Sequence, residues 1–243
     1  MYQAKKLFVA SDMLMSDIIS GNPYLMLMLE HFGIDLVVHE LTVAQLCSKN
    51  AISLDLFLSF ANLFNGFNPA ASAKYAFSDL NTITSFLRSS HQYYLNEKYP
   101  QIRSYIEQMY EINEQASMLM VEKFFDEYFS EVTEHLFYED QVVFSYINKL
   151  FNQLENKHPA ILPENYSVKD YREHHNDIEE KLEDLKSLLL KHLPQQNDQL
   201  VRRNLLLSLF ELEYDLNIHT RIEDAILIPL VEKLEQFVKN NND

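Results

Sequence analysis

Hydrophobic residues recur at steps of three and four along most of the chain after residue 75, which is the spacing of amphipathic α-helices. Four such stripes can be written out, and each is expected to face a core. The first two are Leu80, Ile83, Leu87, His91, Tyr94 and Lys98, and then Val121, Phe124, Tyr128, Val132, His135, Glu139, Val142 and Tyr146. The last two are Val168, Tyr171, His175, Ile178, Leu182, Leu185 and Leu189, and then Leu205, Leu209, Leu212, Leu216, His219, Glu223, Ile226 and Leu230. The pattern predicts an all-α protein with four core-facing helices.

Two of these stripes are interrupted by the same pair of polar residues. His135 is followed four residues later by Glu139, and His219 is followed four residues later by Glu223. At this spacing both side chains project from the same face of a helix. Burying a carboxylate without a partner costs several kcal/mol even after relaxation. A metal ion is the natural partner for both pairs.

The other two stripes each carry one histidine, His91 and His175. His174 lies about 100° around the helix from the apolar face, so His175 is the better ligand candidate of the two neighbours. Taken singly, each histidine also fits a hydrogen-bonded core residue, and each histidine–glutamate pair also fits an ordinary helix-surface contact. Together, four histidines and two carboxylates on four helices favour two metal ions with shared carboxylates. Such a ligand set leaves coordination positions open to a small molecule.

Composition and charge narrow the class of protein. The chain has 243 residues, of which 47% are hydrophobic, with only three glycines and seven prolines, so long helices are expected. Its one cysteine, Cys47, cannot form an intrachain disulfide, and no segment has the pattern of a signal peptide or a membrane span, so we expect a cytoplasmic protein. The formal charge of −16 argues against binding to nucleic acid.

Turn-forming residues indicate where the chain divides. The clearest group covers residues 65–72 and predicts a small helical N-terminal domain (residues 1–72) before the helical bundle (residues 73–243). Within the bundle, connections are expected around residues 158–165 and 192–197. In the N-terminal domain, His31 and His39 are expected to be surface or capping residues, and Cys47 is expected to be buried.

The order of the polar motifs resembles that of a known family. His91 is followed by H-L-F-Y-E-D-Q-V-V-F (135 to 144), H-N-D-I-E-E-K-L-E-D-L-K (175 to 186) and H-T-R-I-E-D-A-I-L-I-P (219 to 229). This series resembles the hemerythrin-like di-iron proteins of the repair-of-iron-centres family. The resemblance covers nearly the whole chain, because that family also has a small N-terminal domain, and residues 32–35 (Phe-Gly-Ile-Asp) look like part of it. Two departures are visible: residues 36–38 (Leu-Val-Val) stand where that family usually has a Cys-Cys pair, and the stretch around His91 is one residue longer before Pro100.

The resemblance implies an antiparallel four-helix bundle that holds a non-haem di-iron centre. It assigns four histidines as terminal iron ligands and two glutamates as bridging carboxylates. In the order of the chain these ligands are His91, His135, Glu139, His175, His219 and Glu223. Manganese or zinc could substitute for iron, because imidazole and carboxylate donors suit all three metals.

The function implied by the resemblance is repair or protection of iron-sulfur clusters after nitrosative or oxidative stress. The partners would be damaged iron-sulfur proteins and a small diatomic ligand, nitric oxide or dioxygen. One alternative is a hemerythrin-like sensor or store of oxygen, nitric oxide or iron without catalysis. Another is a metal-free interaction bundle, which would need cations beside the buried glutamates, although the stripes offer only Lys98. For the N-terminal domain, formation of a homodimer and docking to another protein both remain open.

Overall fold

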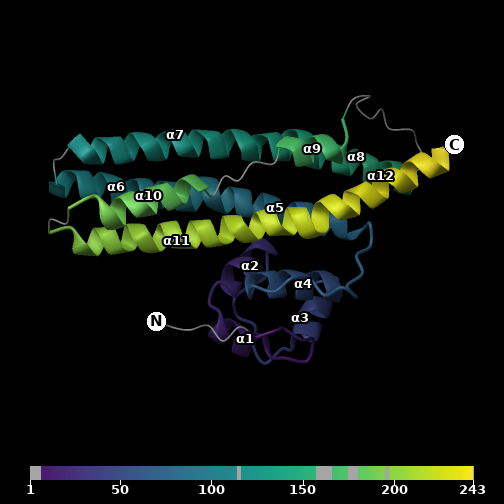
Figure 1. The fold of residues 1–243 in the computed structure, drawn as a ribbon. Coiled ribbons are helices and arrows are strands. Elements are labelled where there is room, and N and C mark those ends of the chain that lie inside the picture. The colour runs from purple at the N-terminus through teal and green to yellow at the C-terminus, as the bar shows by residue number, and fades with distance from the viewer. Residues whose placement is uncertain (1–6, 114–115, 157–165, 175–179, 195–196, 243) are drawn as a thin grey trace. The chain divides into compact units, whose positions relative to one another are not determined.

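The computed structural model describes residues 7–113, 116–156, 166–174, 180–194 and 197–242 (Figure 1). Every regular element among these residues is a helix, and their only extended pairing is an isolated bridge between Leu14 and Thr42. The prediction of an all-α protein is therefore confirmed. Within the same residues, none of the helices is both long enough and apolar enough to cross a membrane.

Four short helices come first along the chain. They are α1 (Met15–Gly21), α2 (Leu25–His31), α3 (Val43–Lys49) and α4 (Leu54–Phe64). Helix α3 begins with a capping box, in which the Thr42 hydroxyl accepts from the Gln45 backbone N–H (3.3 Å) and the Gln45 side chain accepts from the Thr42 N–H (2.9 Å). Cys47 in this helix is buried, as predicted, and burial raises the pKa of its thiol to about 12.

Aromatic rings form much of the core around these short helices. Phe32 packs against Phe86 (4.7 Å between ring centroids), and Phe60 also packs against Phe86 (4.8 Å). His31 lies edge to face on the same Phe86 ring (5.2 Å) and is buried, whereas His39 is exposed. The prediction of a surface position was therefore wrong for His31, because the last residue of α2 faces this aromatic cluster.

The remaining helices form longer runs. Three of these runs consist of two α-helices joined without a break by a π-helical turn. The first is α5 (Asp79–Tyr93), η1 (Tyr94–Lys98) and α6 (Tyr99–Asn113), and the second is α7 (Ala116–Tyr138), η2 (Glu139–Val143) and α8 (Phe144–Asn156). The third is α11 (Gln199–Ile222), η3 (Glu223–Leu227) and α12 (Ile228–Asn242). Between the second and third runs lie α9 (Val168–His174) and α10 (Glu180–Lys191), while the predicted connection at 158–165 lies outside the described residues.

The π-helical turns correct one detail of the predicted stripes. A π turn holds more residues than an α turn, so it shifts the face that follows. In the second run, Val142 was predicted to face the core but is 38% exposed, whereas its neighbour Val143 is buried. Every residue of the first and fourth stripes is buried, Lys98 included, which confirms these two predicted faces.

By spatial contact the chain forms two compact units. The first comprises Met1–Ser89, Phe144–Arg172 and Ile218–Asp243, and the second comprises Ser90–Val143 and Glu173–Asn217. Because each unit is assembled from separate parts of the chain, the predicted boundary between residues 72 and 73 stays a prediction. In the second unit, α6, α7, α10 and the first part of α11 run side by side (Figure 1).

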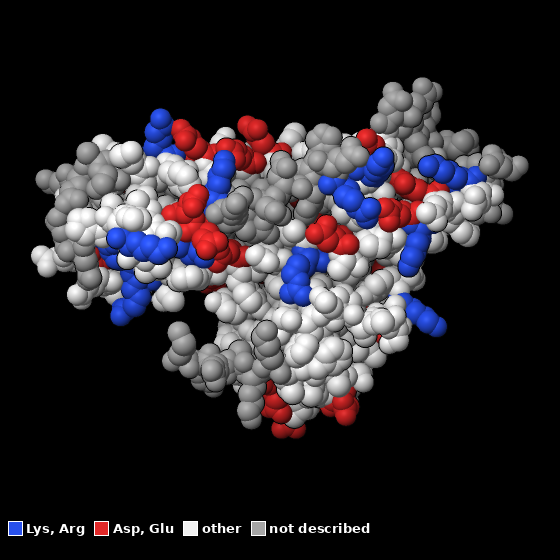
Figure 2. All heavy atoms as spheres, in the orientation of Figure 1, with Lys and Arg blue, Asp and Glu red and all other residues white. Residues whose placement is uncertain are grey.

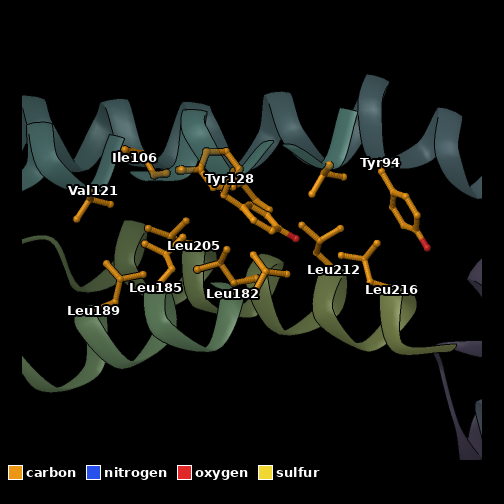
Figure 3. Close-up of a cluster of buried hydrophobic side chains, with 14 of the residues drawn as sticks. Tyr94, Ile106, Val121, Tyr128, Leu182, Leu185, Leu189, Leu205, Leu212 and Leu216 are labelled. Atoms are coloured by element: carbon orange, nitrogen blue, oxygen red, sulfur yellow. The ribbon is translucent and has the colours of Figure 1, made fainter. Parts of the chain in front are cut away.

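The second unit has a core made of leucine, isoleucine, valine and aromatic side chains. Figure 3 shows these side chains pointing toward one another from the surrounding helices. Its labelled members are Tyr94, Ile106, Val121, Tyr128, Leu182, Leu185, Leu189, Leu205, Leu212 and Leu216. The leucines of α10 belong to the third predicted stripe, so that stripe does face a core over the residues described there.

A buried arginine on α11 donates hydrogen bonds to the end of α10 and to the residues that follow it. Arg202 donates hydrogen bonds to the carbonyl oxygens of Leu189 (2.7 Å), Leu193 (3.1 Å) and Pro194 (3.1 Å). Its guanidinium also pairs with Asp198 (2.8 Å), whose side chain is buried. Arg202 therefore satisfies one carbonyl group in the last turn of α10 and two in the segment that follows it.

In the first unit, another arginine joins the third helical run to the end of α4. Arg221 donates to the carbonyl oxygens of Leu63 (3.3 Å) and Phe67 (3.0 Å) and to Asn68 Oδ1 (3.2 Å). A cation at the C-terminal end of a helix also interacts favourably with the helix dipole. Arg221 thus ties the short N-terminal helices to the segment that contains His219 and Glu223.

Charges on the surface are mixed. On the face in Figure 2, Lys and Arg side chains are interspersed with Asp and Glu side chains, while acidic residues outnumber basic ones in the chain as a whole. Among the described ion pairs, Arg103 pairs with Glu122 (2.9 Å) and with Asp126. Partly exposed pairs like these contribute little to stability, so the apolar cores carry most of it.

Two leucines on α11 provide a test of the second core. Leu205 is fully buried and Leu207 is 59% exposed. We expect Leu205→Ala to lower the free energy of unfolding by about 2–5 kcal/mol, because it leaves a cavity among packed side chains. The matched variant Leu207→Ala should change it by less than about 0.5 kcal/mol. Urea unfolding followed by circular dichroism measures both, and equal losses would contradict the packing described for α11.

Candidate metal centre

The glutamate of the first predicted pair lies between two histidines. Glu139 is the first residue of the π turn η2, and its side chain is completely buried. Its Oε1 lies 3.0 Å from Nε2 of His135, one helical turn earlier, and its Oε2 lies 3.2 Å from Nε2 of His91 on α5. Each carboxylate oxygen therefore lies beside a different imidazole.

The second predicted pair has a different surrounding. Glu223 is the first residue of the π turn η3, and its Oε1 lies 3.3 Å from Nε2 of His219. The same oxygen accepts a 2.6 Å hydrogen bond from the hydroxyl of Tyr171 on α9. Glu223, His219 and Tyr171 are all buried. This half of the site thus combines a carboxylate, an imidazole and a phenol.

Three of the predicted ligands form a group that could hold a metal ion. One ligand atom from each of His91, Glu139 and His219 lies within 4.8 Å of the other two, and all three side chains are buried. Two neutral imidazoles and a carboxylate suit iron, manganese and zinc alike. The donor set therefore fits a transition metal, and its chemistry alone does not select one.

The remaining predicted ligands differ in how they relate to this group. His135 is 14% exposed at the side chain and contacts Glu139, while Glu223 contacts His219. His175 lies outside the described residues, so its role as a ligand stays a prediction. The structure thus places His91 and His135 beside Glu139 and places His219 beside Glu223, while His91, Glu139 and His219 form one buried group.

Sequence reasoning missed two polar residues beside the site. Tyr171 was taken only as an apolar member of the third stripe, although a buried tyrosine hydroxyl usually needs a hydrogen-bond partner. Asp140 directly follows Glu139, and its Oδ1 lies 3.3 Å from Nδ1 of His91. Neither contact could be predicted from helical spacing, because each joins residues on helices that are far apart in the sequence.

A second buried polar contact lies one turn from the histidines. Tyr94 follows His91 by three residues, and Asp215 precedes His219 by four. The Tyr94 hydroxyl donates to Asp215 Oδ2 at 2.8 Å, and both side chains are buried. Burial and the neighbouring carboxylate raise the pKa of Tyr94 well above its ordinary value, so this phenol stays protonated and remains a donor.

Lys98, the cation on the predicted stripes, pairs with a carboxylate other than Glu139 and Glu223. Lys98 is buried, and its ammonium group lies 2.9 Å from Glu211 Oε1. The same Glu211 side chain accepts a 2.7 Å hydrogen bond from the Tyr93 hydroxyl. Lys98 is therefore engaged with Glu211, whereas histidine and tyrosine side chains contact Glu139 and Glu223.

Known proteins supply no further guide to this site. Comparison of the chain with protein-family models, with curated proteins and with solved structures finds no match.

Proposed function

We propose that this protein is a hemerythrin-like four-helix bundle that holds a non-haem di-iron centre. The observation that carries the proposal is Glu139, a buried carboxylate with one oxygen beside His91 and the other beside His135. The buried group of His91, Glu139 and His219 supports it. The three long helical runs, together with α9 and α10, carry the described residues of the four predicted stripes, which supports a bundle of this kind.

In this proposal the ligands are those that the family resemblance assigns. His91, His135, His175 and His219 would be terminal ligands, and Glu139 and Glu223 would bridge the ions. Six side chains leave coordination positions open on two ions, so the centre would offer a binding site for nitric oxide or dioxygen. The protein's own part is to hold the imidazoles and carboxylates inside a core from which water is largely excluded.

We further propose a role in the repair of iron-sulfur clusters after nitrosative or oxidative stress, which rests on the family resemblance. Imidazoles and carboxylates without a thiolate would bind iron while leaving it exchangeable, and this suits iron donation. A reaction with the damaging diatomic molecule is the other route. Cys47 adds no thiolate chemistry at neutral pH, because its buried thiol stays protonated.

A second candidate function is a sensor or store of oxygen, nitric oxide or iron. It needs the same metal centre, and the open coordination positions favour it equally. The two functions differ in outcome, because a sensor or store binds its ligand reversibly and leaves a damaged cluster unrepaired.

A metal-free bundle is the third candidate, and specific contacts favour it. Glu139 faces two histidines, while Glu223 accepts from Tyr171 and faces His219, at distances between 2.6 and 3.3 Å. Protonated histidines could balance the buried carboxylates through these contacts. Measured metal content separates this candidate from the other two.

Metal content is the first test. Protein prepared without chelator from cells grown in iron-rich medium should contain about two metal ions per chain, because six ligands with two shared carboxylates suit two ions. Elemental analysis measures it. Glu139→Ala or Glu223→Ala should lose both ions, since a bridging carboxylate serves both, and Glu134→Ala, at an exposed position of α7, should keep them. An intact wild-type protein without metal would support the metal-free candidate instead.

The ligand predicted for the third helix of the bundle can be tested with variants of two neighbouring histidines. We expect His175→Ala to lower metal content and His174→Ala to leave it near the wild-type value, because the two side chains project about 100° apart on a helix. Elemental analysis of the two purified variants decides between them. Greater damage from the substitution at 174 would show that the predicted face of this helix is wrong by one residue.

Repair activity tests the proposed role. The iron-loaded protein should restore activity to an iron-sulfur enzyme damaged by nitric oxide, and Glu139→Ala should fail, because that variant cannot hold the iron. Recovery of enzyme activity after mixing is the measurement, with free ferrous iron at the same concentration as the control. Reversible binding of nitric oxide or dioxygen without repair, seen as a change in visible absorption, would favour the sensor or store.

A further inference from the structure

The two histidine–glutamate motifs continue in the same way, but the structure uses the next residue differently. Asp140 follows Glu139, and Asp224 follows Glu223. The Asp140 side chain is 22% exposed and places Oδ1 3.3 Å from Nδ1 of His91, whereas Asp224 is exposed to solvent. Sequence alone makes the two aspartates equivalent, and only the fold distinguishes them.

His91 therefore lies between two consecutive residues of the π turn η2. Its Nε2 is 3.2 Å from Glu139 Oε2, and its Nδ1 is 3.3 Å from Asp140 Oδ1. The imidazole is completely buried. One ring nitrogen thus lies close to the carboxylate of the candidate metal site, and the other lies close to a carboxylate at the edge of the core.

A metal-binding histidine usually has a carboxylate, a carbonyl or a water near its second ring nitrogen, and Asp140 places a carboxylate there. A neutral imidazole binds a metal through the nitrogen that carries a lone pair, and its other nitrogen carries the proton. When a carboxylate accepts a hydrogen bond from that N–H, it fixes the tautomer and the ring orientation and makes the ligand nitrogen more basic. Loss of such a partner typically weakens metal binding by about 10- to 100-fold.

We propose that Asp140 is a positioning residue of the metal centre: with metal bound, its carboxylate would accept a hydrogen bond from Nδ1–H of His91 and would leave Nε2 to bind a metal ion beside Glu139. The inference rests on the proposed metal-binding function. It also makes the two halves of the site different, although their histidine–glutamate ligand pairs are the same. In the first half of the site an aspartate supports a histidine, whereas in the second half Tyr171 supports the carboxylate of Glu223.

The test uses zinc as the probe and Asp224 as the matched control. Dissociation constants for zinc are measured by competition with a chelator for the full-length wild type, Asp140→Ala, Asp140→Asn and Asp224→Ala. We expect Asp140→Ala to bind zinc about 10- to 100-fold more weakly than the wild type. Asp224→Ala should match the wild type, and Asp140→Asn should fall between, because an amide oxygen still accepts the hydrogen bond but carries no charge.

A second readout separates positioning from a general structural role. Nitrogen-15 NMR of the histidine rings in the zinc-loaded protein reports which ring nitrogen of His91 carries the proton. Wild type and Asp140→Asn should show Nδ1 protonated, and Asp140→Ala should lose this single tautomer. Urea unfolding of the metal-free proteins should give the same midpoint for Asp140→Ala and Asp224→Ala.

The outcomes distinguish this inference from the function on which it rests. If the wild type binds no zinc and no iron, the metal-binding function fails and the inference fails with it. If the wild type binds metal but Asp140→Ala and Asp224→Ala bind it equally well, the function stands and the role of Asp140 is overturned. A loss of affinity in Asp140→Ala that is matched by a lower unfolding midpoint, with the His91 tautomer unchanged, would also overturn it.

Discussion

The need to satisfy two carboxylates inside helical cores governs the candidate site. The Glu139 and Glu223 side chains are fully shielded from solvent. A buried charge without a partner is strongly destabilising, so each glutamate has to be met by other polar groups. Each one is met by a histidine one turn earlier on its own helix and by a residue from elsewhere in the chain, His91 or Tyr171. The apolar stripes around them supply a low-dielectric environment in which such contacts are strong.

Features with a local cause could be predicted from the sequence. The stripes of buried residues and the two histidine–glutamate pairs depend only on helical spacing. Every residue of the fourth stripe, His219 and Glu223 included, is buried as that spacing predicts. The π turns could not be predicted in this way, because hydrophobic spacing near Glu139 fits an ordinary α-helix until Val142. The contacts of Asp140 with His91 and of Tyr171 with Glu223 join distant parts of the chain, so no spacing rule identifies them.

The two glutamates also differ in what their environments allow. Glu139 faces two imidazoles, each through its own oxygen, so both oxygens are directed to possible metal ligands. Glu223 directs one oxygen, Oε1, to both an imidazole and a phenol hydroxyl. A tyrosine hydroxyl donates a hydrogen bond to the carboxylate, and this lowers the electron density that the oxygen can offer to a metal. The pair of motifs that looks symmetrical in the sequence therefore creates two chemically different halves.

The π turns have a consequence for the permitted length of the chain. In an ordinary helix, adding or removing one residue rotates all that follows by about 100°. Each long helical run here contains a turn with more residues than an α turn, and two of these turns begin at the buried glutamates. Deleting one residue within Glu139–Val143 would favour a return to α geometry and would leave the buried face of α8, which includes Phe144 and Ile147, close to its present direction, because a π turn accommodates about one extra residue. A shortened chain could thus retain every predicted ligand and the packing of α8 and still lose the site, because the π turn sets the positions of Glu139 and Asp140 relative to His91.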